Sequence, residues 1–133
     1  MINIKPLKAY TDNYIWLLET NEEVSIVDPG DAKPVLDYLS KTNKNIRDIF
    51  ITHHHFDHTA GVPELENIIS GSIYGPKNSY ELINEKVTQG DTLSSLGIKF
   101  EIIEVPGHTL DHIAFYNEEN DILFCGDTLF AGG

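Results

Sequence analysis

Short runs of apolar residues, separated by polar turns, recur along the whole chain. Runs of this length are typical of strands, and the short polar turns between the first three favour an antiparallel meander. The runs that we expect to form strands are residues 2–10, 14–18, 24–27, 46–51, 72–74, 98–105, 113–116 and 122–124.

A helix is expected after the third of these runs. Asp31 is a residue type that caps helix N-termini, because its side chain can accept a hydrogen bond from a backbone N–H of the first turn. Val35, Leu36 and Leu39 follow with the spacing of an apolar stripe. The helix should therefore begin after Asp31 and run through Leu39.

A second helix is expected after the fourth run. Pro63 suits a first helical position, and Leu65, Ile68 and Ile69 would then lie on one side. Residues 78–83 would form a short helix at best. The expected fold class is α/β with a mixed sheet, and its polar residues gather at strand ends, where α/β enzymes place their chemistry.

The most informative pattern, T-H-H-H-F-D-H-T-A-G, begins directly after the fourth expected strand. Imidazole nitrogens and carboxylate oxygens are ligands suited to Zn²⁺ or Fe²⁺. The alternatives are a fortuitous histidine-rich loop or a tag, but the histidines are interrupted, internal and placed at a strand end. Four residues follow the pattern H-x-H-x-D-H, namely His53, His55, Asp57 and His58.

The spacing within this pattern suggests two adjacent metal ions. Alternate residues of an extended chain point to the same side, so His53 and His55 can face one metal while His54 faces away. Asp57 and His58 come where the chain must turn, so they can reach a second point nearby. The motif therefore predicts a metal centre with room for two adjacent metal ions.

Two further candidate ligands lie at the ends of later strands. His108 follows a Pro-Gly pair, and Asp127 follows a glycine. A lone histidine or aspartate at a strand end is commonly structural. Their order after the histidine pattern nevertheless makes both of them candidates for the same centre.

These motifs, taken together, resemble those of the metallo-β-lactamase superfamily and, within it, the glyoxalase II (hydroxyacylglutathione hydrolase) family. The T-D-N-Y and G-D-T-L-F segments are more particular to the latter than the histidine pattern is. The matching segments are T-D-N-Y-I-W at 11–16, V-D-P-G-D at 27–31, the histidine segment at 51–61, V-P-G-H-T at 105–109 and G-D-T-L-F at 126–130.

The resemblance implies a role for each candidate ligand. His53, His55 and His108 would bind the first metal, and Asp57 and His58 the second. Asp127 would bridge the two metals. Asp57 and Asp127 would thereby carry the catalytic centre, with two zinc ions per intact site, or iron or manganese in their place.

Four residues near the candidate ligands are expected to have roles other than binding metal. The resemblance implies that Asp28 orients the ligand loops and that His54 is not a ligand. His112 is interpreted either as a neighbour that supports a ligand or as a surface histidine at a strand end. Cys125 is interpreted as a small buried residue rather than a nucleophile, since the metals would supply the nucleophile.

One departure from the family pattern concerns the length of the chain. The pattern continues beyond Gly133 with another histidine ligand, the second half of an αββα sandwich and a helical region that holds glutathione. We therefore expect residues 1–133 to be one domain, the N-terminal half of such a sandwich, truncated after the bridging Asp127. Self-association, or pairing with the missing C-terminal half, is expected of a half-sandwich with an uncovered sheet face.

The bulk composition narrows the classes of partner and location. The 9 basic and 21 acidic residues give a formal charge of −12, which disfavours a nucleic-acid partner. No apolar run is long enough to span a membrane, and the N-terminus has no apolar signal region. The single cysteine excludes an intramolecular disulfide. A cytoplasmic protein with neither a nucleic-acid nor a membrane partner is expected.

The implied reaction is hydrolysis of the thioester of S-(2-hydroxyacyl)glutathione, such as S-lactoylglutathione, to a 2-hydroxy acid and glutathione. These residues alone would have weak activity or none, because part of the second metal site and the glutathione-binding region would be missing. Two alternatives remain. One is a persulfide dioxygenase with a single iron, and the other is a metal-binding half-domain that has no activity as it stands. A β-lactamase is a weaker alternative, because no signal peptide is present.

Overall fold

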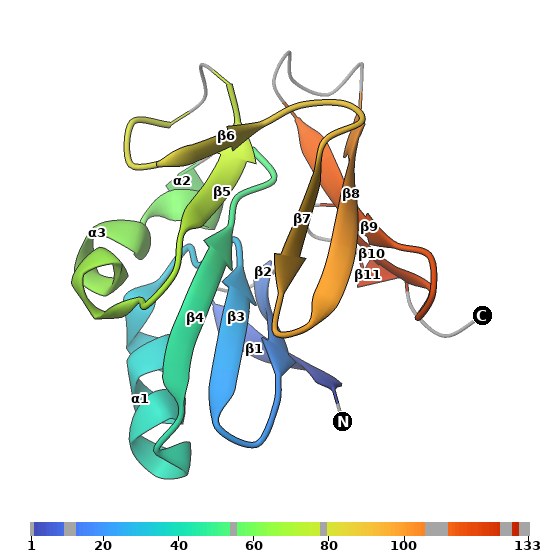
Figure 1. Ribbon diagram of the computed structural model, residues 1–133. Helices are drawn as coiled ribbons and strands as arrows, with labels where there is room; N and C mark the ends of the chain where they lie inside the picture. The colour runs from blue at the N-terminus through green and yellow to red at the C-terminus, as the bar shows by residue number, and fades with distance from the viewer. Residues whose placement is uncertain are drawn as a thin grey trace.

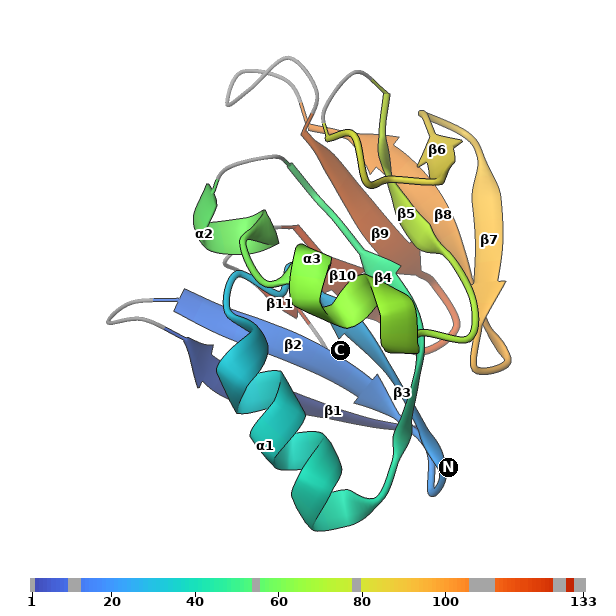
Figure 2. The same cartoon turned by 90° about the vertical axis from the view of Figure 1, so that its left-hand side faces the viewer.

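Two β-sheets face each other, and helices cover the outer face of the first (Figures 1 and 2). The computed structural model describes residues 2–9, 13–53, 56–77, 80–105, 112–125 and 129–130, without the side chains of residues 9, 13, 56, 57, 129 and 130. Both sheets are built from strands of three to seven residues, apart from a two-residue strand at the end. The expected mixed α/β fold class is confirmed.

The first sheet has six strands in sequence order, from β1 to β6. β1, β2 and β3 pair antiparallel, which confirms the predicted meander, whereas β3, β4, β5 and β6 pair parallel. The carboxyl ends of β3 and β4 therefore lie at the same edge. The strands are β1 (Asn3–Ala9), β2 (Asn13–Glu19), β3 (Glu23–Val27), β4 (Asn45–Phe50), β5 (Ile73–Pro76) and β6 (Glu85–Val87).

The first predicted helix is confirmed as α1 (Ala32–Thr42), although it is longer than expected. The Asp31 carboxylate accepts a hydrogen bond from the Lys33 N–H at 3.1 Å, so Asp31 is the N-cap. The helix ends at Asn43, which has a left-handed backbone and donates its N–H to the Leu39 carbonyl. Leu36 was wrongly assigned to the apolar stripe, because it is 39% exposed.

The second predicted helix is broken into short pieces. α2 (Phe56–Thr59) and α3 (Val62–Leu65) are followed by a 3₁₀ turn, η1 (Glu66–Ile68). Leu65 is buried as expected, but Ile68 is 48% exposed. The short helix considered for residues 78–83 is absent from the described part of that segment, 80–83, which forms a turn.

The second sheet has five antiparallel strands in the order β11-β10-β9-β8-β7. Three strands, β6, β7 and β11, were not predicted. β6 and β7 each carry only one apolar residue, and β11 is only two residues long. The strands are β7 (Thr92–Ser95), β8 (Ile98–Glu104), β9 (Ile113–Asn117), β10 (Ile122–Phe124) and β11 (Leu129–Phe130).

Two apolar cores hold these layers together. One lies between the helices and the first sheet and contains Ala32, Val35 and Leu65. The other fills the space between the sheets, where the Phe50 and Phe115 rings stack with their centroids 4.8 Å apart. Alternation of side chains along β2 supplies both cores, since Leu17 belongs to the first and Leu18 to the second.

A buried polar contact also joins the two sheets. The Ser95 hydroxyl on β7 donates to the Asp48 carboxylate on β4 at 2.6 Å and lies 2.5 Å from the Ser25 hydroxyl on β3. The other Asp48 oxygen accepts the Ser72 N–H at 2.8 Å. Because these groups are buried, their mutual hydrogen bonds replace those lost to water. Among the described residues, no helix is long and apolar enough to cross a membrane.

Candidate metal centre

The centre lies where β3 and β4 end, at one edge of the first sheet. Asp28 follows β3, and its N–H donates to the Phe50 carbonyl at the end of β4 at 2.8 Å. Asp28 has a φ of 52°, a left-handed conformation that aspartate tolerates better than most residues. The parallel pairing of β3 and β4 thus brings Asp28 beside the histidine segment that follows β4.

The Asp28 carboxylate is buried and accepts three hydrogen bonds. Its Oδ1 accepts the Thr52 N–H at 2.8 Å, and its Oδ2 accepts the Thr52 hydroxyl at 2.6 Å. His58 Nδ1 lies 3.0 Å from the same Oδ2. Both oxygens are therefore engaged by neighbours, as the predicted orienting role of Asp28 requires.

His53 and His58 converge beside Asp28. Both side chains are buried, and their ring centroids are 4.2 Å apart. One donor atom from each histidine and from Asp28 can be chosen so that the three lie within 4.8 Å of one another. Because the Asp28 oxygens already accept hydrogen bonds, we assign metal-binding capacity to the imidazoles rather than to this carboxylate.

The hydrogen bond of His58 decides which of its nitrogens can bind a metal. An ionised carboxylate can only accept, so His58 Nδ1 carries the proton in its contact with Asp28. Nε2 of the neutral ring then keeps its lone pair. Metal-binding histidines in proteins are commonly held by a carboxylate in this way, so the donor set fits a divalent transition metal.

His112 packs against His53 from the second sheet. The residue is 7% exposed, and its ring stacks on the His53 ring, with centroids 4.6 Å apart and planes 28° apart. Its carbonyl accepts the Val105 N–H, and the next N–H, that of Ile113, donates to the Thr52 carbonyl at 2.9 Å. The interpretation of His112 as a surface histidine is therefore wrong.

Gly61 allows the short helices to pack against the loop after Asp28. A Cβ atom at this position would lie 2.6 Å from the Pro29 carbonyl oxygen and 2.7 Å from the Ala32 nitrogen. The Gly61 N–H donates to that same carbonyl at 2.8 Å. The glycine of the T-H-H-H-F-D-H-T-A-G pattern thus permits a close approach of two backbones.

Cys125 lies near the centre at the end of β10 and is half-buried rather than fully buried. Burial raises the pKa of its thiol, and the Asp28 carboxylate raises that pKa further. A thiol with a raised pKa is a poor nucleophile near neutral pH, because the thiolate is the reactive form. The prediction that Cys125 is not the nucleophile agrees with this environment.

Several predicted site residues lie outside the described part of the structure. α2 includes the backbone of Asp57, but its side chain is not described. The roles of these residues stay predictions; they are His54, His55, Asp57, His108 and Asp127. Thr52 matches no pattern that predicts a role, and its only signal is its place directly before the first histidine of the pattern.

Comparison with known proteins identifies the family. The family model of the metallo-beta-lactamase superfamily matches residues 11–133. The chain is 49% identical to a hydroxyacylglutathione hydrolase from Pseudoalteromonas translucida and 46% identical to one from Idiomarina loihiensis. These matches cover 100% and 99% of this chain but only 52% and 53% of those proteins. The chain thus spans about half the length of the curated relatives it matches.

Solved structures show the same fold. The crystal structure of BLEG-1, a B3 metallo-beta-lactamase, superimposes with a TM-score of 0.78 at 19% sequence identity. That superposition covers 91% of this chain and 70% of the other. The family model covers nearly the whole chain, and the two facing sheets and the buried histidine pair agree with it. The chain therefore belongs to the metallo-β-lactamase superfamily.

Proposed function

We propose that the protein is a metal-dependent thioester hydrolase that cleaves S-(2-hydroxyacyl)glutathione to a 2-hydroxy acid and glutathione. The observation that carries this proposal is the 46–49% identity, over nearly all of this chain, to relatives named hydroxyacylglutathione hydrolase. The convergence of His53 and His58 beside Asp28 supports it, since such a hydrolase needs imidazole ligands.

The proposed ligand set follows the order of the motifs. His53, with His55 and His108, holds the first metal, while His58 and Asp57 hold the second, and Asp127 is shared. The sites of His53 and His58 must then be adjacent, and the 4.2 Å between their ring centroids is compatible with this. The metals are proposed to be zinc, because the donors are mainly imidazole nitrogens.

Bound divalent cations would supply Lewis-acid activation of a water molecule and of the thioester carbonyl. The residues of the chain hold the ligands in place for that chemistry. Asp28 keeps the proton of His58 on Nδ1, and the buried surroundings exclude bulk water from both rings. Cys125 keeps its proton near neutral pH and takes no nucleophilic part.

The leaving group of the proposed substrate needs little help from a general acid. Glutathione leaves as a thiolate, whose pKa as a simple thiol is about 8.5, so it departs without being protonated first. We propose S-lactoylglutathione as the substrate, which places the protein in the detoxification of methylglyoxal. We further propose that it acts in the cytoplasm, with the glutathione thioester as its partner.

The test is thioester hydrolysis by the full-length protein. We expect S-lactoylglutathione to be hydrolysed, with release of thiol, and a chelator to abolish the activity until Zn²⁺ is restored. His53→Ala should lower kcat/KM at least about 100-fold, because it removes a ligand. Glu22 is exposed, so Glu22→Ala is the control and should leave the rate unchanged.

Two results would contradict the proposed function. One is a failure of the zinc-loaded protein to hydrolyse glutathione thioesters. The other is one iron per chain together with oxygen uptake in the presence of a persulfide, which would indicate a dioxygenase instead. Metal analysis of the purified protein, combined with an oxygen electrode, separates these outcomes.

A further inference from the structure

We propose that Thr52 is a positioning residue that fixes the tautomer of His53 and couples it to His58. This inference rests on the proposed function, in which both histidines bind metal. The Thr52 side chain is fully buried. Its hydroxyl oxygen lies 2.6 Å from Asp28 Oδ2 and 2.9 Å from His53 Nδ1, so one atom contacts both groups.

A count of protons assigns the direction of each hydrogen bond. A threonine hydroxyl has one proton, and the Asp28 carboxylate can only accept, so Thr52 donates its proton to Asp28. The hydroxyl oxygen can then only accept from His53. His53 Nδ1 must therefore carry a proton, and Nε2 of the neutral ring keeps the lone pair that a metal needs.

The same Asp28 oxygen links the two histidines. Oδ2 accepts from the Thr52 hydroxyl and from His58 Nδ1, so both rings have their proton on Nδ1 and their lone pair on Nε2. Thr52 bonds to both Asp28 and His53 and so joins them directly. Without the Thr52 hydroxyl, Asp28 would still accept from His58, but the hydrogen bonds through Thr52 that link Asp28 to His53 Nδ1 would be lost.

The backbone of Thr52 holds the hydroxyl in this position. Its N–H donates to Asp28 Oδ1 at 2.8 Å, and its carbonyl accepts the Ile113 N–H from β9 at 2.9 Å. The residue is thus fixed by the first sheet and by the second. A residue held from both sides can orient a ligand at little further cost in conformational entropy.

Two substitutions separate the hydroxyl from the shape of the side chain. Thr52→Val keeps the shape and removes the hydroxyl, whereas Thr52→Ser keeps the hydroxyl. Loss of a contact that orients a metal ligand commonly lowers metal affinity about 10–100-fold. We therefore expect Zn²⁺ affinity to fall at least about tenfold in Thr52→Val and to stay within about threefold of the wild type in Thr52→Ser.

The experiment uses the full-length protein and two measurements. Nitrogen-15 NMR of the imidazole rings in the metal-free protein, at a pH where they are neutral, reports which nitrogen of His53 is protonated. Competition with a chromophoric chelator reports Zn²⁺ affinity. We expect the Nδ1–H form in the wild type and in Thr52→Ser, and a shift towards the Nε2–H form in Thr52→Val.

Several outcomes would overturn the role of Thr52. A wild-type His53 with its proton on Nε2 would do so, and this result needs no variant to fold. Equal losses of affinity in Thr52→Val and Thr52→Ser would also do so, as would an unchanged affinity in Thr52→Val. Failure of thioester hydrolysis with the expected tautomer and affinities would contradict the proposed function alone.

Discussion

At the scale of single residues, each described histidine of the centre is held by a neighbour that is not an expected ligand. Asp28 and Thr52 hold the Nδ1 sides of His58 and His53. His112 packs against the face of the His53 ring. Contacts of this kind limit the rotation of an imidazole before any metal arrives, which lowers the entropic cost of binding.

The stacking of His112 on His53 can be tested by a pair of substitutions. An aromatic pair contributes about 0.5–1.5 kcal/mol beyond the burial of its area. We expect His112→Ala to weaken Zn²⁺ binding about two- to tenfold, and His112→Phe, which keeps an aromatic face, to restore most of the loss. Chelator competition measures both. Equal losses in the two variants would mean that a ring nitrogen, and not stacking, is what matters.

A second buried carboxylate, Glu19, makes stability depend on pH. Burial would raise the pKa of Glu19, but hydrogen bonds from Tyr38, Lys44 and Lys5 outweigh burial and hold that pKa below its ordinary value of 4.5. The lysine nitrogens lie 2.9 and 3.1 Å from the carboxylate oxygens. The stabilisation is therefore fully present above a pH of about 4.5, and it is lost as the pH falls through the lower, folded-state pKa.

Substitution of Glu19 gives the corresponding prediction. Glu19→Gln should lower the free energy of unfolding by about 2 kcal/mol at pH 7, because it removes charge-assisted hydrogen bonds. The difference from the wild type should shrink as the pH falls below about 4.5, since the wild-type carboxylate then becomes protonated. Urea unfolding at several pH values measures this. The exposed Glu22→Gln is the control, and an equal loss in both variants would refute the argument.

At the scale of elements, the short helices after β4 hold the histidine segment against the loop after β3. Gly61 is the closest point of this contact, because its backbone lies against that of Pro29 and Ala32. Main-chain atoms cannot move aside as the end of a flexible side chain can. The position of α2, which carries His58, therefore depends on the absence of a side chain at Gly61.

Two glycine substitutions compare a steric clash with a purely conformational cost. We expect Gly61→Ala to destabilise the protein by about 3 kcal/mol and to weaken metal binding, since a methyl group would overlap backbone atoms. Gly90 has a φ of 89° and open space around it, so Gly90→Ala should cost about 1 kcal/mol and leave metal binding unchanged. Thermal unfolding and chelator competition measure these effects, and similar losses in both variants would exclude the steric explanation.

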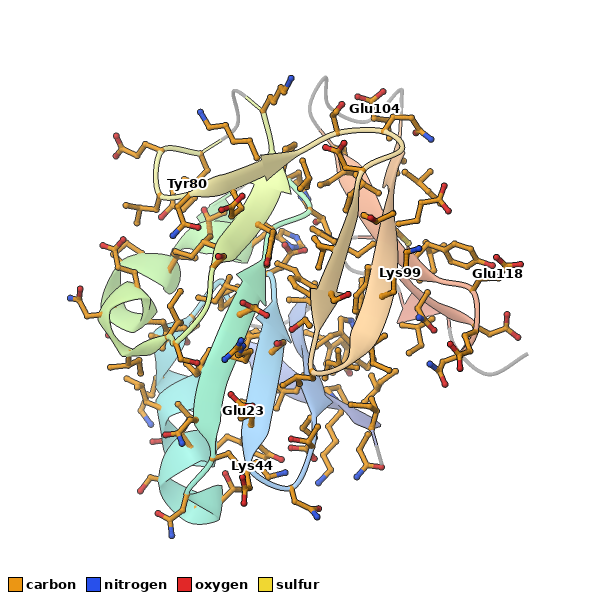
Figure 3. The ribbon with its side chains drawn as sticks, in the orientation of Figure 1. Glu23, Lys44, Tyr80, Lys99, Glu104 and Glu118 are labelled. Carbon is orange, nitrogen blue, oxygen red and sulfur yellow. The ribbon has the colours of Figure 1, made fainter. Side chains whose placement is uncertain are left out.

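At the scale of the whole molecule, the two sheets differ in how their outer faces are covered. α1, α2 and α3 lie on the outer face of the first sheet (Figure 2). Among the described residues, no helix covers the second sheet, and Lys99 and Glu118 lie on its outer side (Figure 3). Ile103 and Leu123, which are partly exposed, alternate with buried neighbours and so share this outer face.

We expect residues 1–133, expressed alone, to self-associate through this outer face. Burial of partly exposed aliphatic side chains contributes about 1–2 kcal/mol each, which is enough to favour association at high concentration. Leu123→Lys should weaken the association, while Leu36→Lys, on the exposed side of α1, should not. Light scattering at low salt measures the mass. A well-ordered monomer in the unsubstituted chain would contradict this expectation.

The sequence by itself determined the features that depend on neighbours along the chain. Short apolar runs between polar turns located most strands, and Asp31 located the start of α1, because a cap acts on the next two or three residues. The histidine pattern located the candidate metal centre for a similar reason, since its residues are few and adjacent. Motif order along nearly the whole chain also pointed to the family that the comparisons confirm.

The tertiary structure decided what depends on segments far apart in the sequence. Leu36 and Ile68 have apolar side chains at helical spacing, yet they are exposed because neither turns towards a sheet. β7 has too few apolar residues to be recognised, and its Ser95 is buried because it meets Asp48 of the other sheet. Likewise, the pairing of β3 with β4 places Asp28 beside Thr52, and the packing of β9 against these strands places His112 beside His53. Such hydrogen bonds and ring contacts require distances that no local pattern specifies.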